Sequence, residues 1–234
     1  MRQIILDTET TGLDPRSGHR IIEIGCVEMI NRKLTGNNYH QYIHPDREVE
    51  AEAIEVHGIT NEFLEDKPKF EEIAQAFFDY IKGAELVIHN AAFDVGFIDH
   101  EFALLDESAK FGCVADHCSV VDTLMLARKK HRGQKNNLDA LCKRYEIDNG
   151  HRTLHGALLD AEILADVYLA MTGGQTQMSF DGGVDAAHGQ DQETERVMRL
   201  SSDRPPLKVI KANQAEIEAH QLLCEKLEDN LAKW

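Results

Sequence analysis

The sequence has few cysteines, and none of them forms a Cys-x-x-Cys pair. There are five, an odd number: Cys26, Cys113, Cys118, Cys142 and Cys224. This pattern indicates reduced thiols in a reducing compartment rather than a disulfide framework. Cys113, His117 and Cys118 lie close together, but their spacing matches no common zinc template. The sequence therefore does not favour a zinc centre.

Long apolar runs are also missing. No stretch approaches the roughly 18 apolar residues that a membrane span requires. Near the N-terminus, Asp7 interrupts the apolar residues before the core of a signal peptide could form. Hydrophobic residues still make up 42% of the 234 residues, which is enough for one catalytic domain with a good core and a modest appendage. We therefore expect a cytoplasmic protein without membrane contact.

Basic residues are scarce relative to acidic ones. The chain has 25 Lys and Arg against 41 Asp and Glu, a net charge of −16. Proteins that bind nucleic acid unaided are usually basic, because phosphate neutralisation supplies much of the affinity. Either this protein does not bind nucleic acid, or metals and a partner bring the substrate in. One locally basic stretch is either a solvated face or a path for a template strand or primer end; it contains Arg128, Lys129, Lys130, Arg132, Lys135, Lys143, Arg144 and Arg152.

Short apolar runs mixed with helical patterns indicate an α/β domain. Runs rich in Ile, Val and Leu predict strands over residues 3–9, 21–30, 39–44, 84–89 and 119–122. Helical spacing predicts helices over 70–81, after residue 89 as far as about Leu105, and over 137–145 and 157–171. Early strands followed by strands mixed with helices predict a mixed sheet flanked by helices.

The composition changes after Met171, so the sequence predicts three parts. Residues 1–172 are the folded domain, and residues 173–206, rich in Gly, Pro, Gln and Asp, are a flexible linker. Residues 207–234 regain helical spacing, with an apolar stripe that no second element covers; it comprises Ile217, Leu223, Cys224, Leu227, Leu231 and Trp234. Residues 175–180 (QTQMSF) place Met and Phe in the linker, which indicates a docking motif unless they occur there by chance.

Four carboxylates occur in settings that suggest metal binding. Asp7 and Glu9 are two residues apart in a strand, so their side chains lie on one face of the sheet. Asp94 follows the strand 84–89, and Asp160 lies inside an apolar helix, where burying a bare charge costs several kcal/mol. Converging carboxylates repel one another unless cations neutralise them. Hard oxygen ligands of this kind suit Mg²⁺ or Mn²⁺.

Each of these residues also has a simpler interpretation. Asp7 and Glu9 could mark a turn, Asp94 could be a helix N-cap and Asp160 could lie on a solvated helix face. His155 could be a surface or core histidine, but it stands five residues before Asp160, where it could accept a proton at neutral pH. Taken together and in this order, the five residues favour two-metal hydrolysis of a phosphodiester.

Three motifs resemble those of the DEDD exonucleases. They are IILDTETTG at residues 4–12, NAAFD at 90–94 and HGALLDA at 155–161. A histidine five residues before the last aspartate, with Gly156 after it in place of tyrosine, is typical of the histidine subclass, the DEDDh exonucleases. From residue 3 to about 171 the chain is similar to the proofreading subunits of bacterial replicative DNA polymerases, including the stretches 56–60 and 138–145.

The resemblance implies a ribonuclease H-like fold and a 3′→5′ exonuclease that removes mispaired 3′-terminal nucleotides from DNA. It implies that Asp7, Glu9, Asp94 and Asp160 hold two divalent metal ions, Mg²⁺ or Mn²⁺, and that His155 is the general base. It also implies a substrate-binding set in which two further residues, Glu52 and His57, contact the terminal nucleotide beside Asp7, Glu9 and Asp160.

The tail resembles the docking region of the same subunits. Residues 175–180 are similar to the hexapeptide by which bacterial replication proteins bind the sliding clamp, with Gln175 hydrogen-bonded and Met178 and Phe180 in a hydrophobic pocket. Residues 207–234 are similar to the segment that docks on the polymerase catalytic (alpha) subunit. Whether a small theta-like subunit also binds is left open by the sequence.

Two other functions also stay open. The first is a DEDDh exoribonuclease of RNA processing, since two-metal chemistry acts on DNA and RNA alike. The second is a non-enzymatic adaptor that joins clamp and polymerase. The tail argues against the first, because a free-standing ribonuclease needs no docking segment. The complete set of acids with His155 argues against the second.

Overall fold

Six strands of the described residues form one mixed sheet in the N-terminal domain. The structure, a computed structural model, describes residues 1–106, 108–150, 154–173 and 213–221. The sheet has the order β3-β2-β1-β5-β6, and β4 also pairs with β2. The strands are β1 (Arg2–Thr10), β2 (Ile21–Ile30), β3 (Lys33–Leu34), β4 (Tyr39–Tyr42), β5 (Glu85–Ile88) and β6 (Ser119–Asp122). The predicted α/β class with a mixed sheet is confirmed.

The central strand β1 lies between an antiparallel and a parallel neighbour. It pairs with β2 in a register that sets Asp7 opposite Gly25 and Glu9 opposite Glu23. On its other side it runs parallel to β5, and β5 runs parallel to β6. Apolar residues at both faces make β1 a buried strand, and its acids begin where the pairing with β5 ends at Leu6. The acids therefore stand at the carboxyl end of the parallel strands, where ligands usually bind in α/β folds.

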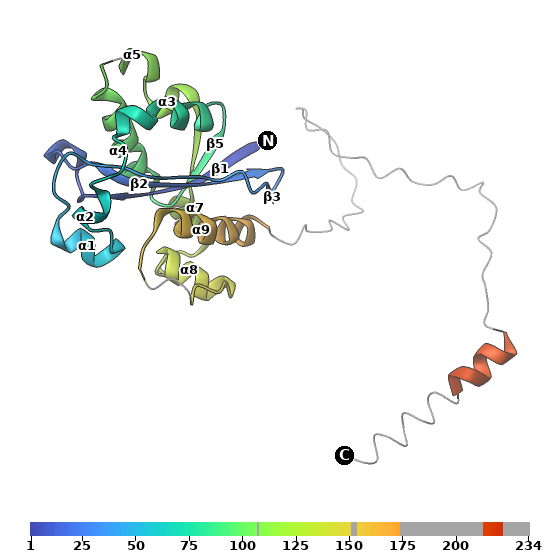
Figure 1. Cartoon of the computed structure of the whole chain (residues 1–234). Helices are drawn as coiled ribbons and strands as arrows, with labels where there is room; N and C mark the ends of the chain where they lie inside the picture. The colour runs from blue at the N-terminus through green and yellow to red at the C-terminus, as the bar shows by residue number, and fades with distance from the viewer. Residues whose placement is uncertain (107, 151–153, 174–212, 222–234) are drawn as a thin grey trace. The chain divides into compact units, whose positions relative to one another are not determined.

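One face of the sheet packs against helices α3 and α4 (Figure 1). This layer contains α3 (Phe70–Ile81), α4 (Ala91–Ala103) and two short helices, α5 (Ser108–Phe111) and α6 (Val114–His117). Phe77, Phe97 and Phe102 are fully buried there, against Ile4 and Leu6 of β1. A partly buried ion pair also ties the layer to the start of β2, because Arg20, the residue before β2, donates to both carboxylate oxygens of Glu101 at 2.8 and 2.7 Å.

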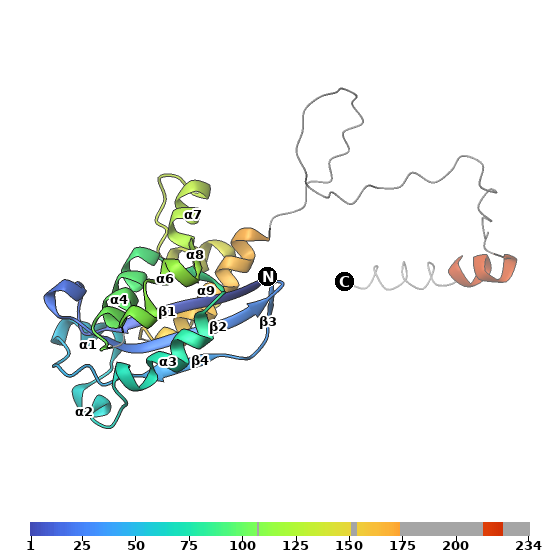
Figure 2. The ribbon, with the colours of Figure 1, turned by 90° about the horizontal axis from the view of Figure 1, so that it is seen from above.

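The opposite face is covered by α9 (Ala157–Thr172), with α8 (Leu138–Tyr145) packed beyond it (Figures 1 and 2). Ile5 of β1, Val27 of β2 and Val87 of β5 form a core with Ala161, Leu164 and Ala165 of α9. The remaining helices are α1 (Ala51–His57), α2 (Asn61–Leu64), α7 (Thr123–Lys130) and the 3₁₀ turn η1 (Pro15–Ser17). Helix α9 thus brings its first turn to the end of β1 that carries the acids.

Most of the predicted elements are found, with shifted ends in some cases. The strands at 21–30 and 119–122 and the helix at 70–81 have the predicted bounds. The strand predicted as far as His44 ends at Tyr42, because beyond Ile43 the chain leaves β2 and His44 bridges to Lys69 instead. The helices α1, α2, α5, α6 and α7 and the short strand β3 were not predicted.

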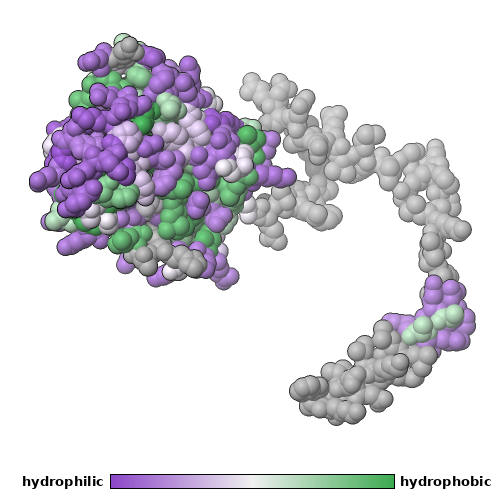
Figure 3. Space-filling view, in the orientation of Figure 1, coloured by the Kyte–Doolittle hydropathy of each residue, from purple (hydrophilic) through white to green (hydrophobic). Residues whose placement is uncertain are grey.

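Outside the domain, the structure describes a helix over residues 214–221 with exposed side chains. The predicted linker, its motif at 175–180 and most of the segment 207–234 lie outside the described residues. The face of the molecule shown in Figure 3 is largely hydrophilic. No helix in the described part of the chain is long and apolar enough to cross a bilayer. Among the described residues, Cys26, Cys113 and Cys118 are free thiols.

Candidate active site

All four predicted acids and the predicted histidine line a single cavity of about 340 Å³. Asp7 and Glu9 reach it from the end of β1, where they are partly exposed while the alternating Thr8 and Thr10 are buried. Further lining residues come from the start of α4, from the start of α8 and from α9. Residues that are far apart in the sequence therefore converge where β1, α4 and α9 meet.

Asp94 is held in place by the turn between β5 and α4. Asn90 caps α4 in the left-handed conformation, with φ 70° and ψ 50°, which turns the chain from the strand directly into the helix. Asp94 lies in the first turn of that helix and is 2% exposed. Thr8 donates a hydrogen bond of 2.7 Å to its carboxylate. Asp94 is thus a buried carboxylate, and the alternative that it serves as the helix N-cap is wrong.

Burial without a cation makes ionisation of Asp94 unfavourable. Burial, with a smaller contribution from the charge of Asp122, raises the pKa of Asp94 to about 7, against the opposing effect of the Thr8 hydrogen bond. A neighbouring cation would favour the ionised form and reverse this shift. The electrostatic environment of the site therefore favours the binding of a positively charged ligand.

We expect the metal-free protein to lose stability as the pH rises from about 4 to about 7. The unfolded Asp94 releases its proton near its ordinary pKa of about 3.9, whereas the folded one retains it up to about 7. In that window the native state binds more protons, so deprotonation favours unfolding. Thermal melts of wild type and Asp94→Asn between pH 5 and 8 test this. The variant should lose less stability over the range, and parallel curves would contradict the assignment.

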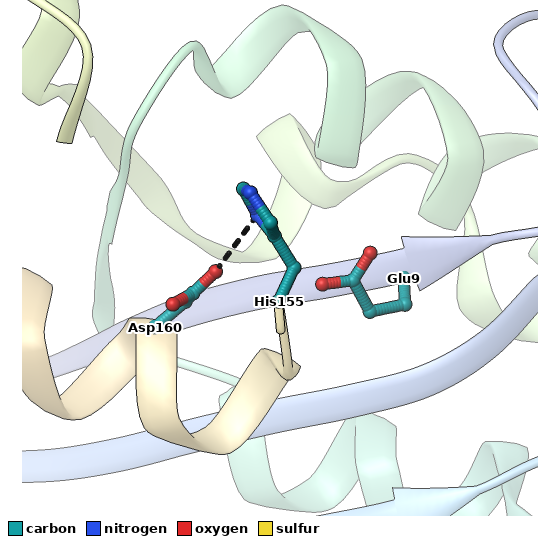
Figure 4. Close-up of side chains that lie close together, drawn as sticks. All are labelled: Glu9, His155 and Asp160. Carbon is teal, nitrogen blue, oxygen red and sulfur yellow. Dashed lines mark ion pairs between the residues drawn. The ribbon is translucent and has the colours of Figure 1, made fainter. Parts of the chain in front are cut away.

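Asp160 and His155 face each other at the start of α9 (Figure 4). Asp160 is 3% exposed, so the alternative of a solvated helix face is wrong. The Nδ1 atom of His155 lies 3.3 Å from a carboxylate oxygen of Asp160. Together with Glu9 they offer three ligand atoms that all lie within 4.8 Å of one another. This spacing is close enough for one ion to contact several of these donors.

The first turn of α9 depends on β2 for its position. Gly156 begins the helix without a side-chain cap, and the buried Glu23 accepts a hydrogen bond of 3.1 Å from the Ala157 N–H instead. The other oxygen of Glu23 lies 2.7 Å from Nε2 of His40. Gly25 completes the contact, since a Cβ there would stand 2.2 Å from the backbone of Ala157. Strand β2 thus fixes the helix that carries Asp160.

We expect Glu23→Ala to weaken metal binding and hydrolysis by roughly 10- to 100-fold, the usual cost of losing a supporting partner of a ligand. Loss of the cap should also lower the free energy of unfolding by about 1 kcal/mol. Glu28→Ala is the matched control, because Glu28 is a buried carboxylate of the same strand whose hydrogen bonds go to Arg2, at 2.6 Å, and to Thr35 and Asn37 instead of to α9. Manganese titration of both variants separates the effect on metal affinity from the effect on stability. Equal losses of manganese affinity in the two variants would mean that Glu23 acts only through stability.

The two predicted nucleotide contacts, Glu52 and His57, lie on α1, and neither of them lines the cavity. His57 is buried, and its Nδ1 accepts a hydrogen bond of 3.0 Å from the Ile59 N–H. Burial lowers the pKa of His57. Glu52 is exposed in the first turn of α1 and does not line the cavity. The His155 N–H donates to the Val56 carbonyl at 3.1 Å, so α1 and the histidine are connected through the backbone.

Sequence reasoning missed the residues that support this site. Thr8 was read only as part of the first motif, although its hydroxyl holds Asp94. Glu23 was placed within an apolar strand, and only the β1–β2 register sets it opposite Glu9. His89, Asn90, Asn137 and Asp139 also line the cavity. Helical spacing and strand alternation gave no signal for these contacts, since they depend on segments brought together by the fold.

Comparison with known proteins agrees with this geometry. The family model described as "Exonuclease" matches residues 4–168. The DNA polymerase III subunit epsilon of Escherichia coli strain K12 is 56% identical over 224 residues, covering 94% of this chain and 90% of that protein. The subunit of the same name from Haemophilus influenzae is 54% identical over 228 residues, covering 94% and 88%. A solved structure of exonuclease X with 5′ overhanging duplex DNA matches with TM-score 0.55 and 28% identity, covering 74% of this chain and 94% of that one.

Fold and site together define an exonuclease of the ribonuclease H-like class, a class that uses divalent metal ions. Within that class, the chain belongs to the family of DNA polymerase III epsilon subunits.

Proposed function

We propose that the cavity hydrolyses the last phosphodiester of a DNA strand, releasing 3′-terminal nucleotides one at a time. The observation that carries the proposal is the convergence of Asp7, Glu9, Asp94 and Asp160 at one cavity. Such a cluster is costly for a protein that binds no cation, because the carboxylates repel one another and two of them are almost fully buried. A cation site is the function that explains this cost.

The donor set fits two divalent ions, with Mg²⁺ or Mn²⁺ as the proposed metals. All four acids offer hard oxygen ligands, which these ions prefer. When bound, such a pair of ions supplies Lewis-acid activation of a water and stabilises the leaving oxygen. Asp7, Glu9, Asp94 and Asp160 would hold the ions. Thr8 would keep the Asp94 carboxylate in position, and Glu23 would keep in position the first turn of α9, which carries Asp160.

His155 acts as the general base in this proposal. Its side chain is 47% exposed, so water reaches it, while Asp160 lies 3.3 Å from its Nδ1 and orients the ring. A neutral imidazole ring can accept a proton from water. His155 therefore takes the proton of the attacking water, and the leaving 3′ oxygen is protonated from solvent.

Proofreading is the biological role that the family supports. The relatives are named DNA polymerase III subunits, so the substrate would be the 3′ end of the strand that the polymerase extends. His57 and Glu52, on α1 beside His155, are the proposed contacts to the terminal nucleotide together with Asp7, Glu9 and Asp160. An RNA-processing role and a purely adaptor role are less well supported, since neither matches this family.

A direct assay tests the proposal. Full-length protein should release mononucleotides from the 3′ end of 5′-labelled single-stranded DNA in Mg²⁺ or Mn²⁺, and chelation should stop the reaction. The same assay on RNA distinguishes the exoribonuclease alternative, which requires RNA to be the better substrate. Failure to hydrolyse either substrate with metal present would leave the adaptor function.

The chain beyond the domain is proposed to hold the nuclease at the replication machinery. In this scheme residues 1–172 are the exonuclease domain, residues 173–206 a flexible linker, and residues 207–234 the segment that binds the polymerase alpha subunit. Gln175, Met178 and Phe180 would bind the sliding clamp. A tether of this kind raises the local concentration of the nuclease at the primer end, which offsets the weak DNA affinity expected from the net charge of −16. A small theta-like subunit could bind the domain as well.

We expect truncation at residue 206 to remove co-elution with the polymerase alpha subunit and to spare co-elution with the clamp. The double variant Gln175→Ala with Phe180→Ala should do the reverse, because the two contacts are separate in this proposal. Both proteins should remain active on single-stranded DNA. A truncated protein that still co-elutes with the polymerase would show that the exonuclease domain itself carries that interface.

A further inference from the structure

A second cavity, of about 620 Å³, adjoins the active-site cavity. It lies between the end of α7 and the loop over residues 131–137, and it shares His89, Asn90 and Asn137 with the active-site cavity. Arg128 and Arg132 line it from the α7 side and the loop. We call this cavity the arginine groove. Because the two cavities share part of their walls, a ligand that fills one can continue into the other.

The two arginines of the groove stand out in an acidic protein. Arg20 and Arg2 each meet a carboxylate, Glu101 and Glu28, whereas Arg32, Arg47 and Arg144 bond backbone carbonyls or neutral side chains. Within the described part of the chain, no carboxylate lies within ion-pair distance of Arg128 or Arg132, and both are exposed. With 41 acids against 25 basic residues, carboxylates are abundant, so this arrangement leaves two guanidinium groups available for an external anion.

Hydrogen bonds from α8 hold the loop over residues 131–137, which forms one wall of the groove. Arg144 donates to the Lys135 carbonyl at 2.9 Å and to the Asn136 side chain at 3.3 Å. The Asn136 amide in turn donates to the Gln134 carbonyl at 2.9 Å. Of the predicted basic stretch, Arg144 therefore has a structural role, and Arg152 lies outside the described residues. The groove is a built site, with its wall held by hydrogen bonds.

His89, on the border of the two cavities, contributes no positive charge. The Thr123 hydroxyl donates to the Ile88 carbonyl at 3.2 Å, so it accepts from Nδ1–H of His89 at 2.9 Å. The Nε2 atom is buried, and no hydrogen-bond partner for it lies among the described residues. Burial lowers the pKa of His89, which keeps the ring neutral. The positive charge of the groove thus comes from the arginines.

We infer that the arginine groove binds the phosphate backbone of the strand whose 3′ end enters the active-site cavity, on the 5′ side of the scissile bond. The inference rests on the proposed function. Guanidinium groups bind phosphate oxygens in bidentate fashion, and amides such as those of Asn137 and Gln134 suit sugar and phosphate contacts. The groove supplies local affinity for a polyanion that the rest of this acidic chain repels.

The test compares a long and a minimal substrate. Arg128→Ala with Arg132→Ala should raise KM for a single-stranded oligonucleotide by roughly tenfold or more, because charge-assisted hydrogen bonds to phosphate are lost. The slope of log KM against log salt should fall by about 0.7 for each phosphate contact removed. The p-nitrophenyl ester of thymidine 5′-monophosphate fills only the active-site cavity. Its kcat and KM, measured with Mn²⁺ in full-length protein, should stay at wild-type values.

Lys129→Ala with Lys130→Ala is the matched control. Both lysines are exposed in the last turn of α7 but do not line the groove. If the arginine and lysine variants show the same KM for the oligonucleotide, the groove does not bind the DNA strand, and only the overall positive charge near α7 affects KM. Unchanged KM in the arginine variant, with loss of co-elution with the polymerase alpha subunit, would instead identify an acidic protein as the occupant and overturn the inference. Wild-type protein inactive on both substrates would overturn the proposed function itself.

Discussion

Asp160→Ala is expected to reduce hydrolysis of single-stranded DNA by at least about a thousandfold, well beyond the roughly 10- to 100-fold cost of losing an outer partner of a metal ligand. Asp160 is nearly fully buried beside Glu9 and His155. Its loss removes one of the oxygen donors that the proposed ions need. A chelation-controlled assay with excess Mn²⁺, compared with isothermal titration of the ion, should show loss of both turnover and binding. Asp7→Ala should behave in the same way.

The same substitution should leave the fold intact. Removing a buried carboxylate relieves repulsion within the cluster, and alanine is the best helix former. We therefore expect the metal-free melting temperature to stay the same or to rise. Asp166→Ala on the same helix is the control, because Asp166 is exposed and should change neither activity nor stability. If Asp160→Ala hydrolyses DNA near the wild-type rate, the hypothesis that Asp160 holds a catalytic metal ion is wrong.

His155→Ala is expected to lower kcat by a factor of roughly 10² to 10⁴, the usual contribution of a general base. The wild-type rate should rise with pH, because only the neutral imidazole ring accepts a proton. In the variant this rise should disappear. Steady-state rates from pH 6 to 9 measure the difference, and an unchanged profile and rate would show that His155 is not the base.

Metal binding separates the base from a ligand. A ring nitrogen of His155 and carboxylate oxygens of Glu9 and Asp160 all lie within 4.8 Å of one another, so the ring is also a candidate ligand. We expect manganese affinity to survive in His155→Ala. A loss of affinity that parallels the loss of rate would assign His155 as a ligand. The control is His117→Ala on α6, whose ring packs against Phe78 at 4.8 Å between centroids and is not part of the cavity.

The sequence predicts those parts of the fold whose residues carry a strong apolar pattern. Helix α3 buries six residues at helical spacing, and its predicted bounds are those observed. Helix α1 buries only His57 and β3 has two exposed residues, so neither shows a stripe that periodicity could detect. Helix α7 buries only Thr123 and Ala127 and ends in three basic residues. Its pattern was therefore read as charge rather than as a helix.

The residues of the site also differ in how far the sequence predicts them. The acids and His155 occur in local motifs, so short stretches of sequence suffice to select them. The supports of these residues depend on distant pairs, such as Glu23 with Ala157 or Thr8 with Asp94. The arginine groove likewise requires the loop to be folded back by α8, and without that contact Arg128 and Arg132 are indistinguishable from their neighbours. Contacts between residues that are far apart in the chain cannot be predicted from the pattern of a single sequence.

The position of α9 has a consequence for the synthesis of the protein. The central strand forms at the start of the chain, but the helix that covers its second face and supplies Asp160 is made only after residue 156. A nascent or prematurely ended chain shorter than this would lack the nuclease centre and would expose Ile5, Val27 and Val87 to solvent. Such fragments are prone to aggregation and degradation. A chain that ends before α9 would therefore lack both the cover of the second sheet face and the aspartate proposed to hold metal.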